Sequence, residues 1–303
     1  MSAIQVFPTD DSEPGISSSI RGALASPGIP ASTTSLIGRD DDVRHIVELV
    51  SRPDVRQVTL TGPGGIGKTR LALEVARTLQ SPVGFGELAA IANPEILPAS
   101  IVRALRFESV FDQPARTFLA ETIADQQLVL VLDNFEHLIT GAALVSWLLA
   151  ACPNLSMLVT SRVRLGLSGE FVRQVEPLGL PDMREQRDVR APARHDAVQL
   201  FIARATAAHA PFRLTDANGA ADVRICERLD GLPLAIELAA ARSYLFSPES
   251  LANRLERRLS LLTGGPADQP ARLQTMRGAL AWSVDLLDPV TRDAWRRLHR
   301  RSR

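Results

Sequence analysis

The residues best suited to chemistry stand in one octet, Gly62-Pro63-Gly64-Gly65-Ile66-Gly67-Lys68-Thr69. The octet matches the pattern G-x-x-x-x-G-K-[ST], in which backbone N–H groups form a cradle for phosphates. Lys68 is the sole lysine among 34 lysine and arginine residues, and its compact ammonium is not interchangeable with a guanidinium. We expect Lys68 to reach the β- and γ-phosphates and the Thr69 hydroxyl to hold Mg²⁺. The octet therefore predicts a site for a nucleoside triphosphate or diphosphate.

Such a loop also needs a carboxylate at the end of a second buried strand, where it positions the metal. Asp133 follows Leu128–Leu132, a run of five aliphatic residues that is typical of a central parallel strand. Open α/β sheets bind their ligands at the carboxyl ends of the strands. We therefore expect Asp133 to bind Mg²⁺ together with Thr69.

The residues after Asp133 bear on catalysis. Asn134 is an amide, which can orient a water molecule but is a poor base. Glu136 is the nearest replacement, and a solvated charge on the following turn explains this residue equally well. The candidate catalytic residues Asp133, Asn134 and Glu136 thus predict slow hydrolysis of ATP.

The surrounding segments have the periodicity needed to position these residues. Leu71, Val75 and Leu79, at i, i+4 and i+8, predict a helix directly after the octet. Candidate strands are Val58–Thr61, Val83–Ala89, Leu128–Leu132, Met157–Thr160 and Phe171–Val175, separated by helical patterns over Glu95–Leu105, Ala115–Ala124 and Gly141–Ala151. This alternation predicts an α/β fold, a P-loop NTPase parallel sheet with helices on both faces.

Composition divides the rest of the chain. Residues 1–34, rich in Ser, Pro, Gly and Ala, predict a disordered leader before a nucleotide-binding domain over residues 35–190. Residues 181–194 have the charge and proline content of a linker. An all-helical domain is expected over residues 191–264, with Gly231 at the C′ position of one helix. Expected helices include Leu234–Leu245, Pro248–Leu259, Leu273–Leu287 and Val290–Leu298.

Charge, cysteine content and hydropathy exclude several classes of protein. The formal net charge is zero, so no overall field attracts nucleic acid or an anionic membrane. Cys152 and Cys226 lie in apolar helical patterns without metal-ligand spacing, and we expect both to be buried. The longest apolar stretch, Gly141–Cys152, is too short to cross a bilayer. We expect a cytoplasmic protein without a membrane partner.

Five segments of the chain occur in a distinctive order. They are Leu36–Asp40, the octet, Leu132–His137, Val159–Arg162 and Gly231–Ala235. The set resembles the nucleotide-binding module of STAND-class signalling NTPases, relatives of the NB-ARC domain. It is most similar to the ATPase part of large LuxR- and SARP-type transcriptional regulators, and the resemblance covers about Ser35 to Ala294.

The resemblance implies further site residues and a mechanism. Ile37, Gly38 and Arg39 would lie near the adenine and ribose, and Pro233 would pack against the base. Arg162 would be a sensor arginine for the γ-phosphate. The complete cofactor-binding set, for ATP or ADP with Mg²⁺, is Ile37, Gly38, Arg39, Gly62, Pro63, Gly64, Gly65, Ile66, Gly67, Lys68, Thr69, Arg70 and Pro233. An ARC-like helical domain would close over this nucleotide.

The resemblance also sets expectations for the end of the chain. The similar proteins continue past Trp282–Leu287 through a winged-helix domain, whereas this sequence ends in the arginine-rich segment Arg296–Arg303. We therefore expect an incomplete winged-helix-like segment with a basic tail over residues 265–303, without a complete DNA-binding module. A truncated gene product is one hypothesis for this ending.

Three functions remain open. The first is a nucleotide-dependent switch in a transcriptional regulator, with slow hydrolysis and with a regulatory partner protein or self-association. The second is a true catalytic ATPase, against which Asn134 argues. The third is a non-hydrolysing interaction module that holds ADP. Phosphate transfer to a small acceptor is the weakest reading, because the five histidines are scattered and form no acceptor site.

Overall fold

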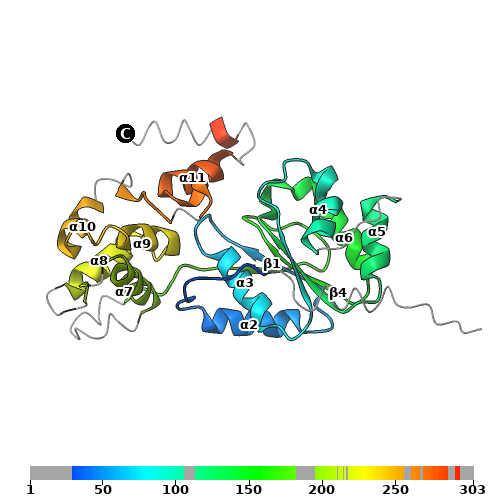
Figure 1. The fold of residues 1–303 in the computed structure, drawn as a ribbon, viewed down its shortest axis with the longest axis horizontal. Coiled ribbons are helices and arrows are strands. Elements are labelled where there is room, and N and C mark those ends of the chain that lie inside the picture. The colour runs from blue at the N-terminus through cyan, green and yellow to red at the C-terminus, as the bar shows by residue number, and fades with distance from the viewer. Residues whose placement is uncertain are drawn as a thin grey trace, which may run out of the picture.

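The computed structural model describes residues 29–105, 113–181, 195–209, 211–213, 215, 218–255, 261–266, 269–285 and 291–293. A five-stranded parallel sheet with the strand order β2-β3-β4-β1-β5 lies at its centre (Figure 1). The strands are β1 (Gln57–Thr61), β2 (Val83–Glu87), β3 (Leu128–Asp133), β4 (Leu155–Thr160) and β5 (Phe171–Gln174). The predicted α/β fold with a parallel sheet is confirmed.

Helices cover both faces of the sheet. α2 (Asp40–Val50) and α3 (Lys68–Thr78) pack on one face, and α4 (Leu97–Ala104), α5 (Ala115–Ile123) and α6 (Ala142–Ala151) pack on the other. Alternate residues of β3 enter the two hydrophobic cores, with Val129 and Val131 on the α3 side and Leu130 on the opposite side. A strand that is buried on both faces needs an uninterrupted apolar run, which β3 has.

The second half of the described chain is helical and has its own core. α7 (Asp196–Ala208), α8 (Gly219–Arg228), α9 (Pro233–Ala240) and α10 (Pro248–Leu255) bury a cluster that includes Phe201 and Cys226. The short 3-10 helix η6 (Ala271–Leu273) and α11 (Met276–Asp285) follow, and Figure 1 shows α11 between these helices and the sheet. Cys152 is buried in the sheet core, so both cysteines are buried, as expected.

Several expected boundaries are wrong. α9 ends at Ala240 and not at Leu245, and the segment that follows forms turns. Tyr244 and Leu245 are 56% and 53% exposed, so the apolar pattern continues beyond the helix without facing a core. The Arg242 guanidinium donates to the carbonyl of Thr263 at 3.0 Å, which fixes the chain just after the helix end.

The other shifts are smaller. β2 ends at Glu87 and not at Ala89, because its neighbour β3 ends at the paired residue Asp133. The helix expected over Leu273–Leu287 is divided, since η6 precedes α11 and α11 begins at Met276. A 3-10 turn over Pro94–Ile96 likewise precedes α4.

Gly231 has a different place in the helix cap from the one expected. α8 ends at Arg228, and the C′ residue is Asp230, which has a φ of 50°. The N–H of Gly231 donates to the Cys226 carbonyl at 3.2 Å and that of Asp230 to the Glu227 carbonyl at 3.0 Å, the pattern of a Schellman cap with Gly231 at C″. Glycine is needed there because a Cβ would lie 2.4 Å from the Leu178 carbonyl oxygen.

Some expectations fall outside the described residues. These are the leader up to residue 28, the linker over residues 182–194, residues 256–260, and the segments 286–290 and 294–303. Among the described helices, none combines the length and the hydropathy that crossing a bilayer requires.

Candidate functional site

The octet forms the turn between β1 and α3. Gly67 is the N-cap of α3 and has a φ of 98°. The first N–H groups of a helix have no partner within it, and the helix dipole adds partial positive charge at the same end. The start of α3 is therefore suited to bind an anion.

Lys68 is folded back over the loop that carries it. Lys68 is 8% exposed, and its ammonium donates to the carbonyl oxygens of Gly62 at 2.8 Å and Pro63 at 3.0 Å. Burial lowers the pKa of Lys68 to about 8, while the nearby Glu136 carboxylate acts in the opposite direction. A phosphate group would give this buried cation the negative partner that neutral carbonyls do not provide.

Asp133 ends β3 and is 1% exposed. The hydroxyls of Thr69 and Thr160 both donate to its Oδ1, at 2.8 Å and 2.6 Å. Burial raises the pKa of Asp133, and these two hydrogen bonds oppose that effect. A hydroxyl and a carboxylate in contact are hard oxygen donors of the kind that Mg²⁺ prefers, and the remaining ligands of such an ion are usually waters and phosphate oxygens. Thr69 and Asp133 thus fit the ion expected from the sequence.

Asn134 directly follows Asp133 and has a left-handed φ of 62°. Its backbone N–H donates to Thr160 Oγ1 at 2.9 Å, and its side-chain amide donates to Asp133 Oδ2 at 2.8 Å. Asn134 therefore holds the carboxylate in place. Thr160 was missed by the sequence analysis, although its position at the carboxyl end of β4 was a signal that could have identified it.

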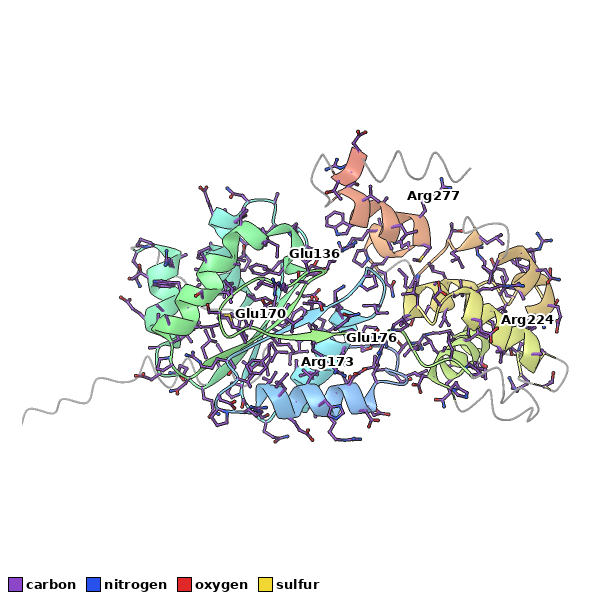
Figure 2. All side chains as sticks on the ribbon, turned by 180° about the vertical axis from the view of Figure 1, so that it is seen from behind. Glu136, Glu170, Arg173, Glu176, Arg224 and Arg277 are labelled. Carbon is purple, nitrogen blue, oxygen red and sulfur yellow. The ribbon has the colours of Figure 1, made fainter. Side chains whose placement is uncertain are left out.

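Glu136 and Arg162 form an ion pair beside the loop. Arg162 Nε lies 3.1 Å from Glu136 Oε1, and the two side chains are only 15% and 5% exposed. Figure 2 shows Glu136 between the sheet and α11. The Arg162 guanidinium also reaches the loop, since a Cβ on Gly64 would lie 3.0 Å from its Nη2. Glu136 is thus a buried, paired carboxylate and not the solvated charge that was the alternative interpretation.

The N-terminus of α9 is in direct contact with the octet. The backbone N–H of Leu234 donates to the Gly65 carbonyl at 3.1 Å. A Cβ on Gly65 would lie 2.8 Å from Leu234 Cβ, and Gly65 has a φ of 82°. Pro233 is the first residue of α9. This contact connects the loop formed by the octet to the helical part of the chain.

Two expected site residues before α2, Gly38 and Arg39, make close contacts with later parts of the chain. Arg39 is 6% exposed, and its guanidinium bonds Asp42 at 2.9 Å and the Glu176 carbonyl at 2.6 Å. It therefore ties the start of α2 to the chain after β5. Gly38, with a φ of 67°, packs so closely on Asp196 that a Cβ would lie 2.2 Å from that residue's Cβ.

Most of the expected site residues line one cavity of about 310 Å³, a size that suits a small ligand. The expected residues in its wall are Ile37, Arg39, Gly64, Gly65, Ile66, Gly67, Lys68, Thr69, Arg70, Asp133, Asn134, Glu136, Arg162 and Pro233. Gly38, Gly62 and Pro63 are not part of this wall.

Four charged residues of the wall were missed by the sequence analysis: Glu87, Arg204, Glu237 and Arg272. Arg204 and Glu237 lie on α7 and α9, where the sequence pattern indicates only amphipathic helices. The Arg272 guanidinium lies 5.3 Å from the ring centroid of Trp282, whose ring in turn packs edge-on against His137 at 6.4 Å. The segment before α11 therefore also contributes to the cavity.

Sequence comparison finds relatives among bacterial regulators. The chain is 40% identical over 249 residues to Putative HTH-type transcriptional regulator Rv0890c of Mycobacterium tuberculosis, covering 80% of this chain and 26% of that protein. It is 35% identical over 270 residues to Uncharacterized protein Rv0894 of the same species, covering 88% and 65%. It is 30% identical over 270 residues to Regulatory protein AfsR of Streptomyces coelicolor, covering 82% and 24%. The chain thus spans about a quarter of the length of the HTH-type relative.

Among solved structures, the chain is similar to a STAND protein with a tetratricopeptide repeat sensor from Pyrococcus horikoshii. The TM-score is 0.44 at 14% identity, over 87% of this chain and 34% of that one. No protein-family model matches the chain.

Proposed function

We propose that the chain is a P-loop NTPase module of the STAND class and that it acts as the nucleotide-dependent switch of a regulator similar to its bacterial sequence relatives. The ligand proposed is ADP or ATP with Mg²⁺. The observation that carries the proposal is the contact between Thr69 Oγ1 and Asp133 Oδ1, at 2.8 Å, beside a buried lysine at the start of α3.

The proposed roles follow from position and charge. Lys68 and the N–H groups of the octet bind the phosphates, and Arg162 supplies a second cation next to Gly64. Thr69 and Asp133 hold the metal, which neutralises phosphate charge when bound. Ile37 and Pro233, both in the cavity wall, are the apolar residues proposed to contact the base.

The switch part of the proposal depends on the contact between the octet and α9. Because Leu234 bonds to Gly65, a change in the loop at the phosphates would be transmitted to the helical part. We propose a nucleotide-binding domain over residues 35–190 and a helical domain over residues 191–264 as the two moving parts. Transcriptional regulation is proposed from the sequence relatives alone.

Slow hydrolysis is the expected activity. Glu136 is the proposed base, but its carboxylate is paired with Arg162 and must leave that partner before it can accept a proton from water. The Asn134 amide donates to Asp133 and is a poor base. The same ion pair also favours an alternative function, a module that holds ADP without hydrolysing ATP. Rapid hydrolysis would instead identify a true catalytic ATPase and would replace both of these functions.

Single-turnover hydrolysis of γ-labelled ATP separates these functions. We expect cleavage slower than about one turnover per minute, reduced further by Glu136→Gln and unchanged by Arg164→Ala, an exposed control on the same loop as Arg162. Binding of ADP with no cleavage would select the holding module. Rapid cleavage that Asn134→Ala abolishes and Glu136→Gln leaves unchanged would contradict the proposed roles.

A further inference from the structure

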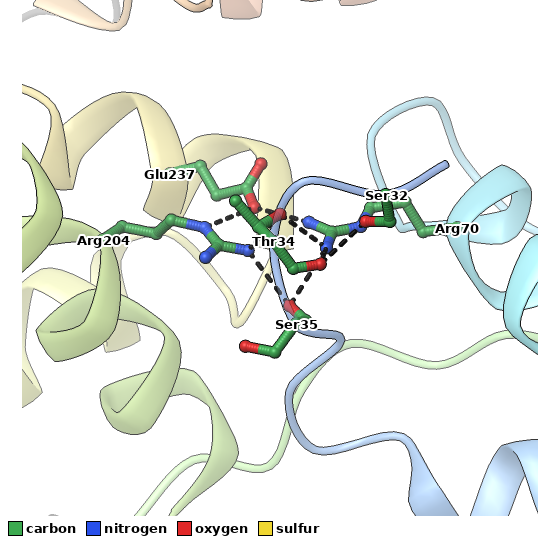
Figure 3. A network of polar contacts seen from close by, with 6 residues as sticks. All are labelled: Ser32, Thr34, Ser35, Arg70, Arg204 and Glu237. Atoms are coloured by element: carbon green, nitrogen blue, oxygen red, sulfur yellow. Dashed lines mark hydrogen bonds and ion pairs between the residues drawn. The ribbon is translucent and has the colours of Figure 1, made fainter. Parts of the chain in front are cut away.

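Three charged side chains and one chain segment meet at the side of the cavity, a group that we call the Glu237 cluster. Its members are Arg70 on α3, Arg204 on α7, Glu237 on α9 and the residues Thr34 and Ser35 before α2 (Figure 3). The cluster therefore connects the helix of the octet, the helical part and the N-terminal segment.

Glu237 is the centre of the cluster. Arg70 Nη1 and Arg204 Nε both donate to Glu237 Oε1, at 3.1 Å and 3.0 Å. The side chains of Glu237 and Arg204 are 18% and 16% exposed, and that of Arg70 is 30% exposed. These pairs are less screened by solvent than pairs on an open surface.

The two guanidinium groups also hold the N-terminal segment. Arg70 Nη2 donates to the carbonyl oxygens of Thr34 and Ser35, at 2.9 Å and 3.0 Å. Arg204 Nη2 donates to Thr34 Oγ1 and to the Ser35 carbonyl, both at 3.3 Å. One carboxylate thus faces two cations, and neutral oxygens accept hydrogen bonds from one further nitrogen of each guanidinium group.

The position of the cluster relates it to the ligand. Arg70 follows Thr69, which lies at the proposed metal position, and Ser35 lies two residues before Ile37, which is in the cavity wall. Arg70, Arg204 and Glu237 are in that wall as well. Movement of the cluster would therefore change the enclosure of whatever occupies the cavity.

We propose that Glu237 is a positioning residue for nucleotide binding, which holds Arg70 and Arg204 together and thereby keeps the helical part and residues 34–37 closed over the cavity. The inference rests on the proposed function, and it adds that the cluster sets how fast the nucleotide leaves. Removing the charge of Glu237 leaves two guanidinium groups facing each other, and like charges at short range repel.

The first test is the dissociation rate of a fluorescent N-methylanthraniloyl derivative of ADP in the presence of Mg²⁺. We expect Glu237→Gln, which keeps the shape of the side chain, to release the nucleotide about tenfold faster. The matched control is Glu48→Gln on the exposed side of α2, which should leave the rate unchanged. Salt weakens the phosphate contacts in both proteins, but because the cluster is ionic, added salt should accelerate release more from the unmodified protein than from Glu237→Gln.

The second test needs no nucleotide. Hydrogen–deuterium exchange should be about tenfold faster in peptides over residues 29–37 of Glu237→Gln, with exchange in β3 unchanged. A general loss of structure would instead accelerate exchange in β3.

The outcomes distinguish this inference from the proposed function. Failure of the unmodified protein to bind the ADP derivative would overturn the proposed function, and with it the role in nucleotide release. Normal binding with unchanged dissociation and unchanged exchange in Glu237→Gln would overturn only the inference about the cluster.

Discussion

The carboxylate of Asp133 is held by three donors before any metal binds. Thr69 and Thr160 donate to one oxygen and the Asn134 amide donates to the other. Burial favours the neutral acid, whereas the donors and a divalent cation favour the carboxylate. The donors thus offset part of the effect of burial, and a bound Mg²⁺ would favour the carboxylate further.

Asp222 on α8 is the opposite case, a buried acid without donors. Asp222 is 0% exposed, and neither of its carboxyl oxygens has a hydrogen-bond partner among the described residues. Burial, with a smaller effect of Glu249, raises the pKa of Asp222 to about 7 from 3.8. Its contribution to stability is therefore full below about pH 4, decreases as the pH rises towards 7, and is constant above that.

Asp222→Asn should therefore become more stable than the unmodified protein as the pH rises. We expect the difference in the free energy of unfolding to grow between pH 4 and pH 7, by about 1.4 kcal/mol for each unit of the pKa shift. Urea unfolding at pH 5 and pH 8 measures it, with the exposed Asp125→Asn as control. An identical pH dependence of stability in the unmodified protein and in Asp222→Asn would show that Asp222 titrates normally.

At the residue scale, the sequence predicts only what is contained in a local motif. Lys68 and Thr69 are fixed by the octet, and Asp133 by the strand that precedes it. The Glu237 cluster could not be predicted, because Arg70 and Glu237 are 167 residues apart and each is an ordinary charged residue on an amphipathic helix. Their meeting depends on how the helical part packs.

At the scale of elements, the contact between the octet and α9 depends on where two helices begin. The first N–H groups of a helix have no partner within it, and α9 satisfies that of Leu234 with the Gly65 carbonyl at 3.1 Å. The partial positive charge of this helix end therefore points at the same loop that α3 begins from. Two helix N-termini thus meet at the octet.

Gly65→Ala should disturb this contact more than backbone strain alone would. The new Cβ would lie 2.8 Å from Leu234 Cβ at a φ of 82°, whereas a Cβ on Gly166, with a φ of 76°, has nothing within 4 Å. We expect Gly166→Ala to cost about 1–2 kcal/mol of stability and Gly65→Ala to cost more. Thermal unfolding of the two variants measures the difference. Equal losses of stability would mean that α9 does not pack against the loop.

Elements were predicted well where burial and periodicity agree. The buried strands β1 and β3 lie within a residue of their expected limits. α9 was predicted too long because Tyr244 and Leu245 continue an apolar pattern on an exposed turn. Helix ends depend on such tertiary contacts, which local sequence does not specify.

At the scale of the molecule, the cavity is built by parts that are distant in sequence. The sheet side supplies Lys68 and Asp133, the helical side supplies Arg204 and Glu237, and the segment before α11 supplies Arg272. Trp282 of α11 touches His137, which follows the strand that carries Asp133. The parallel sheet was predictable from alternation along the chain, whereas this enclosure of the cavity was expected only through the family resemblance.

Titration calorimetry of the purified chain with ADP and ATP, in the presence of Mg²⁺, tests the central claim most directly. We predict binding of either nucleotide, lost or weakened at least a hundredfold, about 3 kcal/mol, in Lys68→Ala and retained in the exposed control Arg164→Ala. Absence of binding by the folded, unmodified chain, or equal affinity in Lys68→Ala, would contradict the claim that this loop holds a polyphosphate.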